Sequence, residues 1–334
     1  MNALFRLVPH LSFSLNWLPI FGLLILLLLN ACSKPPEIAL PWTEQISGTD
    51  ALLTSVFFTD DTTGHVVGGK TFELGIYLST EDAGQHWRVD SIHDKLINSI
   101  HITPARRGHN AGIKGLFRSG DNVLSTWFQQ GLAVERSIPP MNDVFFWDNE
   151  QGLVVGGAAF QNGYVLRLGA DYEILAQDSF DNELSAVCYS DDTTAHIVGF
   201  GIVLRSTDSG FTWQRSTVSG DFFRSVHFPS SSIGYAVGYF GTILKTEDAG
   251  QNWVKLRDGD KLSVSDEPFR SVYFVDPGQG YIVGDDGLFW LTRDGGATWQ
   301  VVGDFPEVDL YEVFVINGQG YIVGASGRIF NFSD

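Results

Sequence analysis

The chain has few cysteines, few basic residues and no long helical pattern, and each shortage excludes a class of protein. Cysteine occurs only twice in 334 residues, and Cys188 falls inside a strand-like run, where a small buried apolar residue is expected. Lysine and arginine number 21 against 39 aspartates and glutamates, which argues against binding to nucleic acid or to anionic lipid surfaces. Beyond the N-terminal segment, no window of useful length has helical periodicity, so a helical domain is not expected.

Signatures of metal and cofactor chemistry are also missing from the sequence. The eight histidines are scattered, with no His-x-x-x-His pair, and there is no Cys-x-x-Cys, so neither a metal site nor a cofactor is predicted. Glycine pairs such as Gly68-Gly69 fall in a recurring turn, and we interpret them as turns rather than as phosphate-binding loops.

A recurring phrase is the most informative feature of the chain. It reads Ser-Thr-Asp-Ser-Gly-Phe-Thr-Trp from Ser206, and copies start at Thr80, Thr246 and Thr292. An apolar residue pair followed by glycine keeps the same period, at Gly68, Gly112 (in a degenerate copy), Gly156, Gly199, Gly238, Gly284 and Gly324. Self-similarity at a period of roughly 40 residues indicates a repeat architecture.

Each repeat contains four strand-sized segments. In one unit they are 223–228, 234–238, 242–245 and a segment from Trp253, all rich in β-branched and aromatic residues and separated by Gly, Asp and Ser clusters. The first segments are centred on Val56, Ile100, Val144, Val187, Val226, Val272 and Val313. Seven such units of about 42 residues predict an all-β fold, a seven-bladed β-propeller of four-stranded blades.

The N-terminal segment is predicted to complete the last blade. The seventh unit ends at Asp334, before its fourth strand can occur, whereas Trp42 stands 14 residues before Val56, close to the 13 or 14 residues that follow Trp87, Trp213 and Trp299. A strand at Trp42 would close the ring and remove an open edge. The propeller is therefore expected to span 42–334 and to leave no room for a second domain.

Residues 1–31 have the features of a targeting segment. A weakly basic start at Arg6 precedes an apolar run over 17–29, which at thirteen residues is short for a membrane span and suits a signal-peptide core. The sequence Leu29-Asn30-Ala31-Cys32 resembles the bacterial lipobox, which implies cleavage before a lipid-modified Cys32. The prediction is a lipoprotein signal peptide at 1–31 and a proline-rich tether at 32–41; a plain N-terminal anchor helix with an incidental cysteine remains the alternative. An acylated Cys32 leaves no intramolecular disulfide to expect.

The recurring phrase matches the Asp-box, or BNR repeat. An aspartate in a tight turn accepts hydrogen bonds from nearby backbone N–H groups, the glycine two residues on permits positive φ, and the tryptophan packs against the neighbouring blade. We therefore expect structural roles for Asp82, Asp208, Asp248, Asp294, Trp87, Trp213, Trp253 and Trp299.

The fuller pattern is more specific than the Asp-box alone. Arg-Ser-Val-x-Phe, then Gly-Tyr-x-Val-Gly, then x-Gly-x-Ile-x-x-Thr-x-Asp-x-Gly-x-x-Trp resembles the photosystem II stability/assembly factor-like propellers, over essentially the whole mature chain. The resemblance implies a seven-bladed lipoprotein that, like the cyanobacterial members, helps to assemble photosystem subunits. We accordingly expect a non-catalytic, monomeric, lipid-anchored propeller that binds or assembles an envelope or membrane protein. Its expected location is the periplasmic side of the outer membrane or the cell surface.

The innermost strands supply the candidate partner-binding rim, because equivalent positions of a propeller form rings around its channel. Two residues before each central residue, all seven positions are polar: Thr54, Asn98, Asn142, Ser185, Arg224, Arg270 and Tyr311. The next positions include Asp143 and Glu312, and the long loop over 257–267 adds Asp258, Asp260 and Lys261. The loops that lead into these strands are acidic, so the rim either captures a basic segment of a partner or a cation, or is merely hydrated.

A glycoside hydrolase is the alternative function, because sialidases and xyloglucanases also carry Asp-boxes. Sialidases need an arginine triad and a tyrosine nucleophile, and Arg224, Arg270 and Tyr311 are too few for that set. An acidic pair formed by Asp143 and Glu312 stays open at this stage.

Overall fold

The computed structural model describes residues 35–334, apart from 114–115, 121–127, 132–138 and 149–150. The expected signal peptide at 1–31, the expected lipidation site Cys32 and one repeat tryptophan, Trp127, lie outside the described residues. Pro35–Asp334 form one compact unit. Within the described part of the chain, no helix has the length and apolar character needed to cross a membrane.

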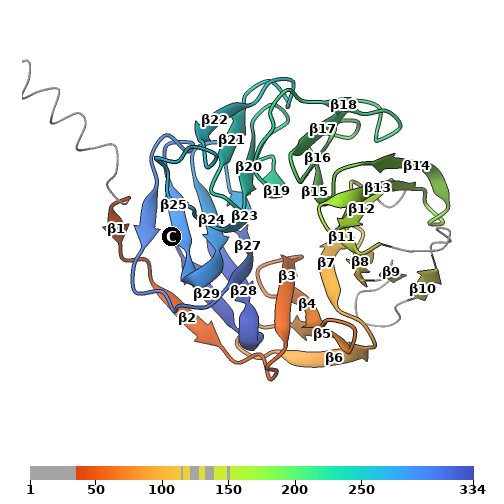
Figure 1. The fold of residues 1–334 in the computed structure, drawn as a ribbon. Helices are drawn as coiled ribbons and strands as arrows, with labels where there is room; N and C mark the ends of the chain where they lie inside the picture. The colour runs from red at the N-terminus through yellow and green to blue at the C-terminus, as the bar shows by residue number, and fades with distance from the viewer. Residues whose placement is uncertain (1–34, 114–115, 121–127, 132–138, 149–150) are drawn as a thin grey trace, which may run out of the picture. The chain divides into compact units, whose positions relative to one another are not determined.

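The unit is an all-β propeller whose sheets are arranged in a ring (Figure 1). Six sheets have four strands and one has five. Three four-stranded sheets contain β3 (Leu52–Phe58), β4 (Gly64–Lys70), β5 (Leu74–Thr80) and β6 (Arg88–His93); β7 (Ile97–Ile102), β8 (Gly108–Gly112), β9 (Leu116–Gly120) and β10 (Phe128–Gly131); and β11 (Met141–Phe146), β12 (Gly152–Ala158), β13 (Gln161–Leu168) and β14 (Ile174–Phe180).

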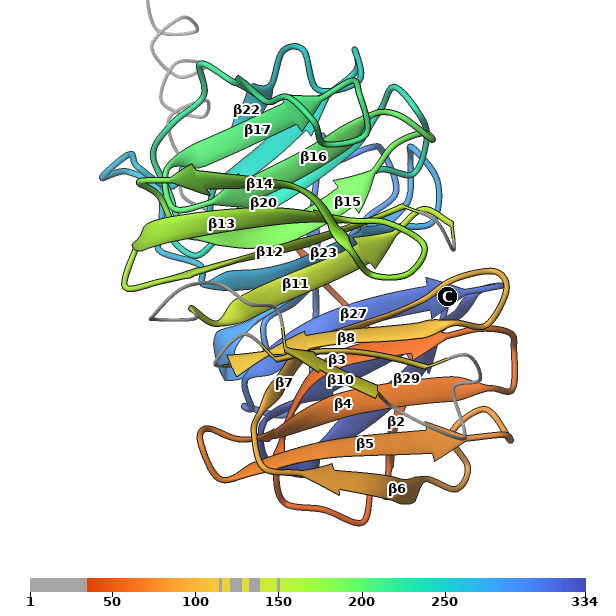
Figure 2. The same cartoon turned by 90° about the vertical axis from the view of Figure 1, so that its right-hand side faces the viewer.

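The next two four-stranded sheets follow the same chain order. They contain β15 (Leu184–Tyr189), β16 (Ala195–Gly199), β17 (Ile202–Ser206) and β18 (Gln214–Arg215), then β19 (Phe223–His227), β20 (Gly234–Gly238), β21 (Ile243–Thr246) and β22 (Val254–Arg257). Figure 2 views the ring from the side, where the sheets containing β4, β8, β12 and β16 follow one another in sequence order.

The last two sheets combine both ends of the described chain. One contains β23 (Phe269–Phe274), β24 (Gly280–Gly284), β25 (Phe289–Thr292), β26 (Gln300–Val302) and β1 (Glu37–Ile38); the other contains β27 (Leu310–Ile316), β28 (Gln319–Gly324), β29 (Ile329–Ser333) and β2 (Trp42–Gln45). Two 3₁₀ turns, η3 (Asp285–Gly287) and η4 (Ala325–Gly327), follow β24 and β28.

Strand β2 completes the last sheet, as the spacing of Trp42 predicts. It pairs antiparallel with β29, and Trp42 lies opposite Phe332. The Trp42 ring also contacts Phe305 and Phe330, with ring centroids 5.1 and 5.7 Å apart. The ring closes because β27 contacts β3, just as every other innermost strand contacts the next.

One sheet has more than the expected four strands, and the added strand lies within the segment predicted as a tether, 32–41. Strand β1 pairs parallel with β26 and gives that sheet a fifth strand. Backbone bonds from Val301 to the Pro36 carbonyl and from Gly303 to the Ile38 carbonyl, both 2.9 Å, hold the segment, and Leu40 is buried. The short strand had no repeat signal because, in the part of the chain that the structure describes, no other sheet has a fifth strand.

The repeat glycines are required by close backbone contact. A Cβ on Gly199 would lie 2.0 Å from the Glu183 carbonyl oxygen, and one on Gly284 would lie 2.1 Å from the Pro268 carbonyl oxygen. The apolar pair before each glycine faces two different sheets. Val198 packs with Val226 of the following sheet, whereas Ile197 packs with Leu153 of the preceding one.

Candidate functional site

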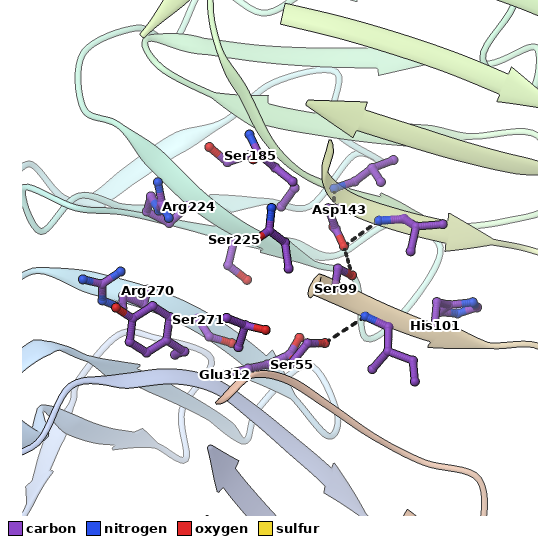
Figure 3. A pocket seen from close by; sticks show the side chains of 18 of the residues that line it. Ser55, Ser99, His101, Asp143, Ser185, Arg224, Ser225, Arg270, Ser271 and Glu312 are labelled. Atoms are coloured by element: carbon purple, nitrogen blue, oxygen red, sulfur yellow. Dashed lines mark hydrogen bonds between the residues drawn. The ribbon is translucent and has the colours of Figure 1, made fainter. Parts of the chain in front are cut away.

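A cavity of about 580 Å³ lies at the centre of the ring and is lined by all seven innermost strands (Figure 3). Both predicted polar rings face it. The lining includes Thr54, Asn98, Asn142, Ser185, Arg224, Arg270 and Tyr311 of the first ring, and Ser55, Ser99, Asp143, Ala186, Ser225, Ser271 and Glu312 of the second.

A β-bulge in each innermost strand explains how two consecutive residues both face the cavity. The pairing register shifts across Thr54 in β3 and across Arg224 in β19, and the same shift occurs in the other five innermost strands. The bulge leaves one residue unpaired and re-aims its side chain, so the usual alternation of a strand is broken there. The first polar ring therefore consists of the seven bulge residues.

The second polar ring joins neighbouring sheets. Its side chains accept hydrogen bonds from backbone N–H groups of the next innermost strand: Ser55 from Ile100 (3.2 Å), Asp143 from Val187 (2.8 Å), Ser225 from Val272 (3.2 Å), Ser271 from Val313 (3.3 Å) and Glu312 from Val56 (2.6 Å). Ser99 instead donates to Asp143 at 2.6 Å. Ala186 has no acceptor, so this series of bonds is interrupted between β15 and β19.

The two carboxyl groups of this ring have raised pKa values because they are buried. Burial raises the pKa of Asp143 to about 6, against the lowering effect of hydrogen bonds from Ser99, Val187 and Val144. Burial raises the pKa of Glu312 to about 8, and the charge of Asp143 adds to that shift. Because both groups accept inter-sheet bonds, they brace the ring.

Three bulge residues also bond to the neighbouring sheet. The Thr54 hydroxyl donates to the Ile97 carbonyl at 2.7 Å, the Asn98 amide to the Met141 carbonyl at 2.9 Å, and the Asn142 amide to the Leu184 carbonyl at 2.7 Å. The structure thus brings Asn98 and Asn142 to the cavity wall as expected, but one amide N–H of each is already used within the fold.

The two arginines of the first ring lie at one end of the cavity, and only one of them has an acidic partner (Figure 3). Arg270 forms an ion pair with Asp285 and stacks over the Tyr311 ring, with the guanidinium carbon 4.3 Å from the ring centroid. Arg224 lies 4.7 Å from the Phe222 centroid and, among the described residues, makes no hydrogen bond or ion pair. Burial and the positive charge of Arg270 lower the pKa of Arg224.

Aromatic side chains line the cavity one residue beyond each central position. Ring contacts run from His227 through Tyr273, Phe314, Phe57 and His101 to Phe145, with centroids 4.3 to 5.3 Å apart. Burial lowers the pKa of His101 to about 3 and that of His227 to about 4, so both are neutral at physiological pH. Cys188 of β15 takes the seventh position and interrupts this layer too.

A phenylalanine patch adjoins the arginine end of the cavity. It consists of the exposed Phe160 and Phe200, which are 53% and 36% exposed with ring centroids 4.9 Å apart, and of Phe222, which is buried beneath them. Phe222 contacts both rings at 5.6 Å. The patch was not predicted from the sequence. An aromatic residue just after the repeat glycine, as in Gly199-Phe200, was the available signal.

The long loop over 257–267 is held by bonds within itself and to its own sheet. Lys255 pairs with Asp258 at 2.7 Å and with Asp260 at 2.8 Å, and Lys261 lies 3.6 Å from Asp258. Arg257 donates to the Ser265 carbonyl at 2.7 Å. Since their charges are paired in this way, Asp258 and Asp260 are weaker candidates for partner contacts than the sequence suggested.

The repeat aspartates are bound to their own turns. Asp208 accepts from the Thr212 backbone N–H at 2.8 Å and from the Thr212 hydroxyl at 2.6 Å, and Asp82, Asp248 and Asp294 accept the equivalent backbone bond at 2.8 to 2.9 Å. Gly210 has a φ of +87°, which favours glycine. The repeat tryptophans pack between sheets, as Trp213 does against Leu153, Trp253 against Ala186 and Trp299 against Val237.

Comparison with known proteins gives the fold of this chain. No protein-family model and no curated protein sequence matches it. A solved structure described as YCF48 bound to D1 peptide has a TM-score of 0.69 at 16% identity and covers 90% of this chain and 100% of its own. YCF48 from Cyanidioschyzon merolae has a TM-score of 0.66 at 14% identity, covering 87% and 98%. The WD40 β-propeller domain of Doa1 has a TM-score of 0.68 at 11% identity, covering 87% and 97%. At these identities, the similarity shows a β-propeller fold.

Proposed function

We propose that this propeller is a non-catalytic protein-binding module and that the arginine end of its cavity is the binding face. One observation carries the proposal: an open central cavity ends beside exposed aromatic side chains that do not serve the core. Exposed apolar groups beside a few polar ones are typical of sites that bind proteins. The solved YCF48 structure with a D1 peptide supports the idea that a propeller of this fold takes up a peptide segment.

Assembly or stabilisation of a membrane protein is the more specific form of the proposal. It rests on the sequence pattern of the repeats, and the lipid anchor at Cys32 would hold the propeller at the cell envelope. Metabolic labelling with a palmitate analogue tests the anchor. Labelled protein that becomes unlabelled in Cys32→Ser supports it, and equal labelling of both proteins contradicts it.

The hydrolase alternative has less support from the cavity. Asp143 and Glu312, the acidic pair that it needs, both accept backbone bonds that join neighbouring sheets. Among the described residues, no three His, Cys, Asp or Glu side chains are grouped so that they could hold a metal ion. Hydrolysis of a sialoside or a β-glucan that disappears in Glu312→Gln would favour this alternative over the binding module.

Quantitative capture from detergent-solubilised membranes tests the proposal. The bait is the full chain, and the matched variant replaces Phe160 and Phe200 with serine on the proposed face. A control variant replaces Val275, an apolar residue 41% exposed beyond the opposite end of β23. The proposal predicts a protein that is captured by wild type and by Val275→Ser but lost from Phe160→Ser/Phe200→Ser. Capture that is equal in all three overturns the assignment of the face.

A further inference from the structure

Among the described residues, Arg224 has no hydrogen-bond or ion-pair partner in the wall of the cavity. Phe222, the residue just before β19, contacts its guanidinium, but a ring face does not replace the hydrogen bonds that five N–H donors need. Glu183 lines the same cavity, yet its Oε2 accepts from the Phe160 backbone N–H at 2.7 Å and forms no ion pair with Arg224. A partly buried charge without a partner costs stability in the unbound protein.

Arg270, at the equivalent position of the next sheet, has the acidic partner that Arg224 lacks among the described residues. Its Nε donates to Asp285, and the other oxygen of Asp285 accepts from the Tyr239 hydroxyl at 3.0 Å. Asp285 belongs to the turn that follows the repeat glycine Gly284. The corresponding residue after Gly238 is Tyr239, which has no carboxylate, and Arg224 is left without its counterpart of Asp285.

The neighbouring strand β15 supplies a second hydrogen-bond donor to the part of the cavity wall near Arg224. Ser185 lines the cavity there, and its hydroxyl is buried without a hydrogen-bond partner among the described residues. Ala186 and Cys188 of the same strand are the small residues that interrupt the polar and aromatic layers. Rotation about χ1 of Ser185 can turn its hydroxyl towards the cavity.

The phenylalanine patch indicates that the ligand has an apolar group next to its anionic group. Arg224 stacks on Phe222, which contacts the exposed Phe160 and Phe200. A ligand whose anionic group reaches Arg224 therefore places its adjoining atoms on an apolar surface. An acidic residue next to an apolar one in a protein segment has this chemistry.

We propose that Arg224, with Ser185, binds a carboxylate of an acidic protein segment, whose neighbouring apolar side chain rests on the exposed rings of Phe160 and Phe200. This inference rests on the proposed function and deepens it. It differs from the sequence-based expectation that the rim captures a basic segment, because among the described residues the arginine end of the cavity has a cation without an ion-pair partner.

Titration calorimetry with blocked peptides tests this proposal. The probes are acetyl-Ala-Phe-Glu-Ala-amide, the same peptide with Gln in place of Glu, and sodium acetate. Wild type is expected to bind the Glu peptide at least about tenfold more tightly than the Gln peptide, as for a hydrogen-bonded charge pair. Acetate alone is expected to bind at least about tenfold more weakly than the Glu peptide, because it does not contact the aromatic patch.

Two variants separate the carboxylate site from the rest of the face. Arg224→Gln is expected to remove the preference for Glu over Gln, whereas Arg106→Gln, which removes a charge beyond the opposite end of β7, keeps it. Because Arg224 has no partner, Arg224→Gln is also expected to unfold at or above the wild-type midpoint. Arg270→Gln, which leaves Asp285 unpaired, is expected to unfold below it.

The outcomes distinguish this inference from the proposed function. Equal binding of the Glu and Gln peptides overturns the carboxylate site and leaves the aromatic face as a binding surface. Failure of either peptide to bind, or acetate binding as tightly as the Glu peptide, also overturns the protein-segment proposal. The capture experiment with the Phe160→Ser/Phe200→Ser variant decides separately whether the face binds a protein at all.

Discussion

The Glu312 carboxyl group accepts a hydrogen bond from the Val56 backbone N–H at 2.6 Å and so joins the last innermost strand to the first. The two residues are 256 positions apart in the chain. The same junction is closed on its outer side by β2, which pairs with β29. Closure of the ring therefore depends both on a side chain in the cavity and on a strand from the N-terminal end of the fold.

Glu312 should make the stability of the propeller fall in mildly alkaline solution. Its folded pKa of about 8 lies above its ordinary value of 4.5, because burial disfavours the charged form. Its contribution is thus fully present below pH 4.5 and is lost as the pH rises through 8. We expect the free energy of unfolding to fall by at most about 1.4 kcal/mol per pH unit across this window.

Urea unfolding between pH 7 and 8.5 measures this effect, since burial holds the pKa values of His101 and His227 at about 3 and 4, and that of Asp143 is about 6, all below that range. Glu312→Gln, which keeps an acceptor for the Val56 N–H, should flatten the profile. An equally steep profile in the variant would assign the pH dependence to another group.

Replacement of a repeat glycine should damage the fold strongly. A Cβ on Gly284 would meet the Pro268 carbonyl oxygen, so backbone atoms must move, and Gly284→Ala is expected to cost about 3 kcal/mol. Gly278 is the matched control, because its nearest neighbour is an Asp276 side-chain oxygen 3.3 Å away and its φ is not positive. Chemical denaturation of both variants checks the contrast; similar losses would refute the steric explanation.

Loss of the Trp42 ring should weaken ring closure. Trp42→Ala removes the contacts with Phe305 and Phe330, and we expect a loss of about 2 kcal/mol, below the usual range for fully buried tryptophans because Trp42 is partly exposed. Trp147, 38% exposed and outside the closing strand, is the control. Deletion of residues 38–48 should lower the unfolding midpoint further than Trp42→Ala does. An unchanged midpoint after the deletion would contradict closure by the N-terminal strand.

Removal of a repeat carboxylate should lower stability without affecting partner binding. Asp248 accepts from the Asn252 backbone N–H, the Asn252 amide and the Thr246 hydroxyl, all at 2.8 to 2.9 Å. These bonds lower its pKa, and Asp248→Ala is expected to cost about 1 kcal/mol, like the loss of a helix cap. Asp192→Ala, at an exposed loop position, should cost less than half of that. Loss of binding in the folded Asp248 variant would instead place this carboxylate in the site.

The sequence was sufficient to predict the repeat, the innermost strands and the closing strand, because each depends on local patterns repeated along the chain. Gly199 and Gly284 could be recognised in the sequence because each lies against a backbone carbonyl where a residue with a Cβ would clash. Trp42 was identified by spacing alone. Strand β1 escaped prediction because its pairing with β26 occurs once and adds a parallel strand that no repeat shares.

The roles within the cavity depend on contacts between repeats, which a single sequence does not display. Asn98 and Arg224 occupy the same repeat position, yet the amide bonds to the next sheet, whereas the guanidinium has no hydrogen-bond partner within the described part of the chain. The difference arises from the neighbouring strand or turn. A Met141 carbonyl accepts from Asn98, whereas Arg224 has Tyr239 at the position where Arg270 has the carboxylate of Asp285. Glu312 likewise looked like a candidate acid until its bond to Val56 was seen.

Site-specific photocrosslinking in the producing cells tests the central claim most directly. Benzoylphenylalanine in place of Phe200 lies on the proposed binding face, and in place of Val275 it lies beyond the opposite end of the innermost strand at similar exposure. The account predicts a discrete protein adduct from position 200 and none from position 275. An adduct from 275 of equal yield, or no adduct from 200 in protein that is folded and expressed at normal level, would contradict it.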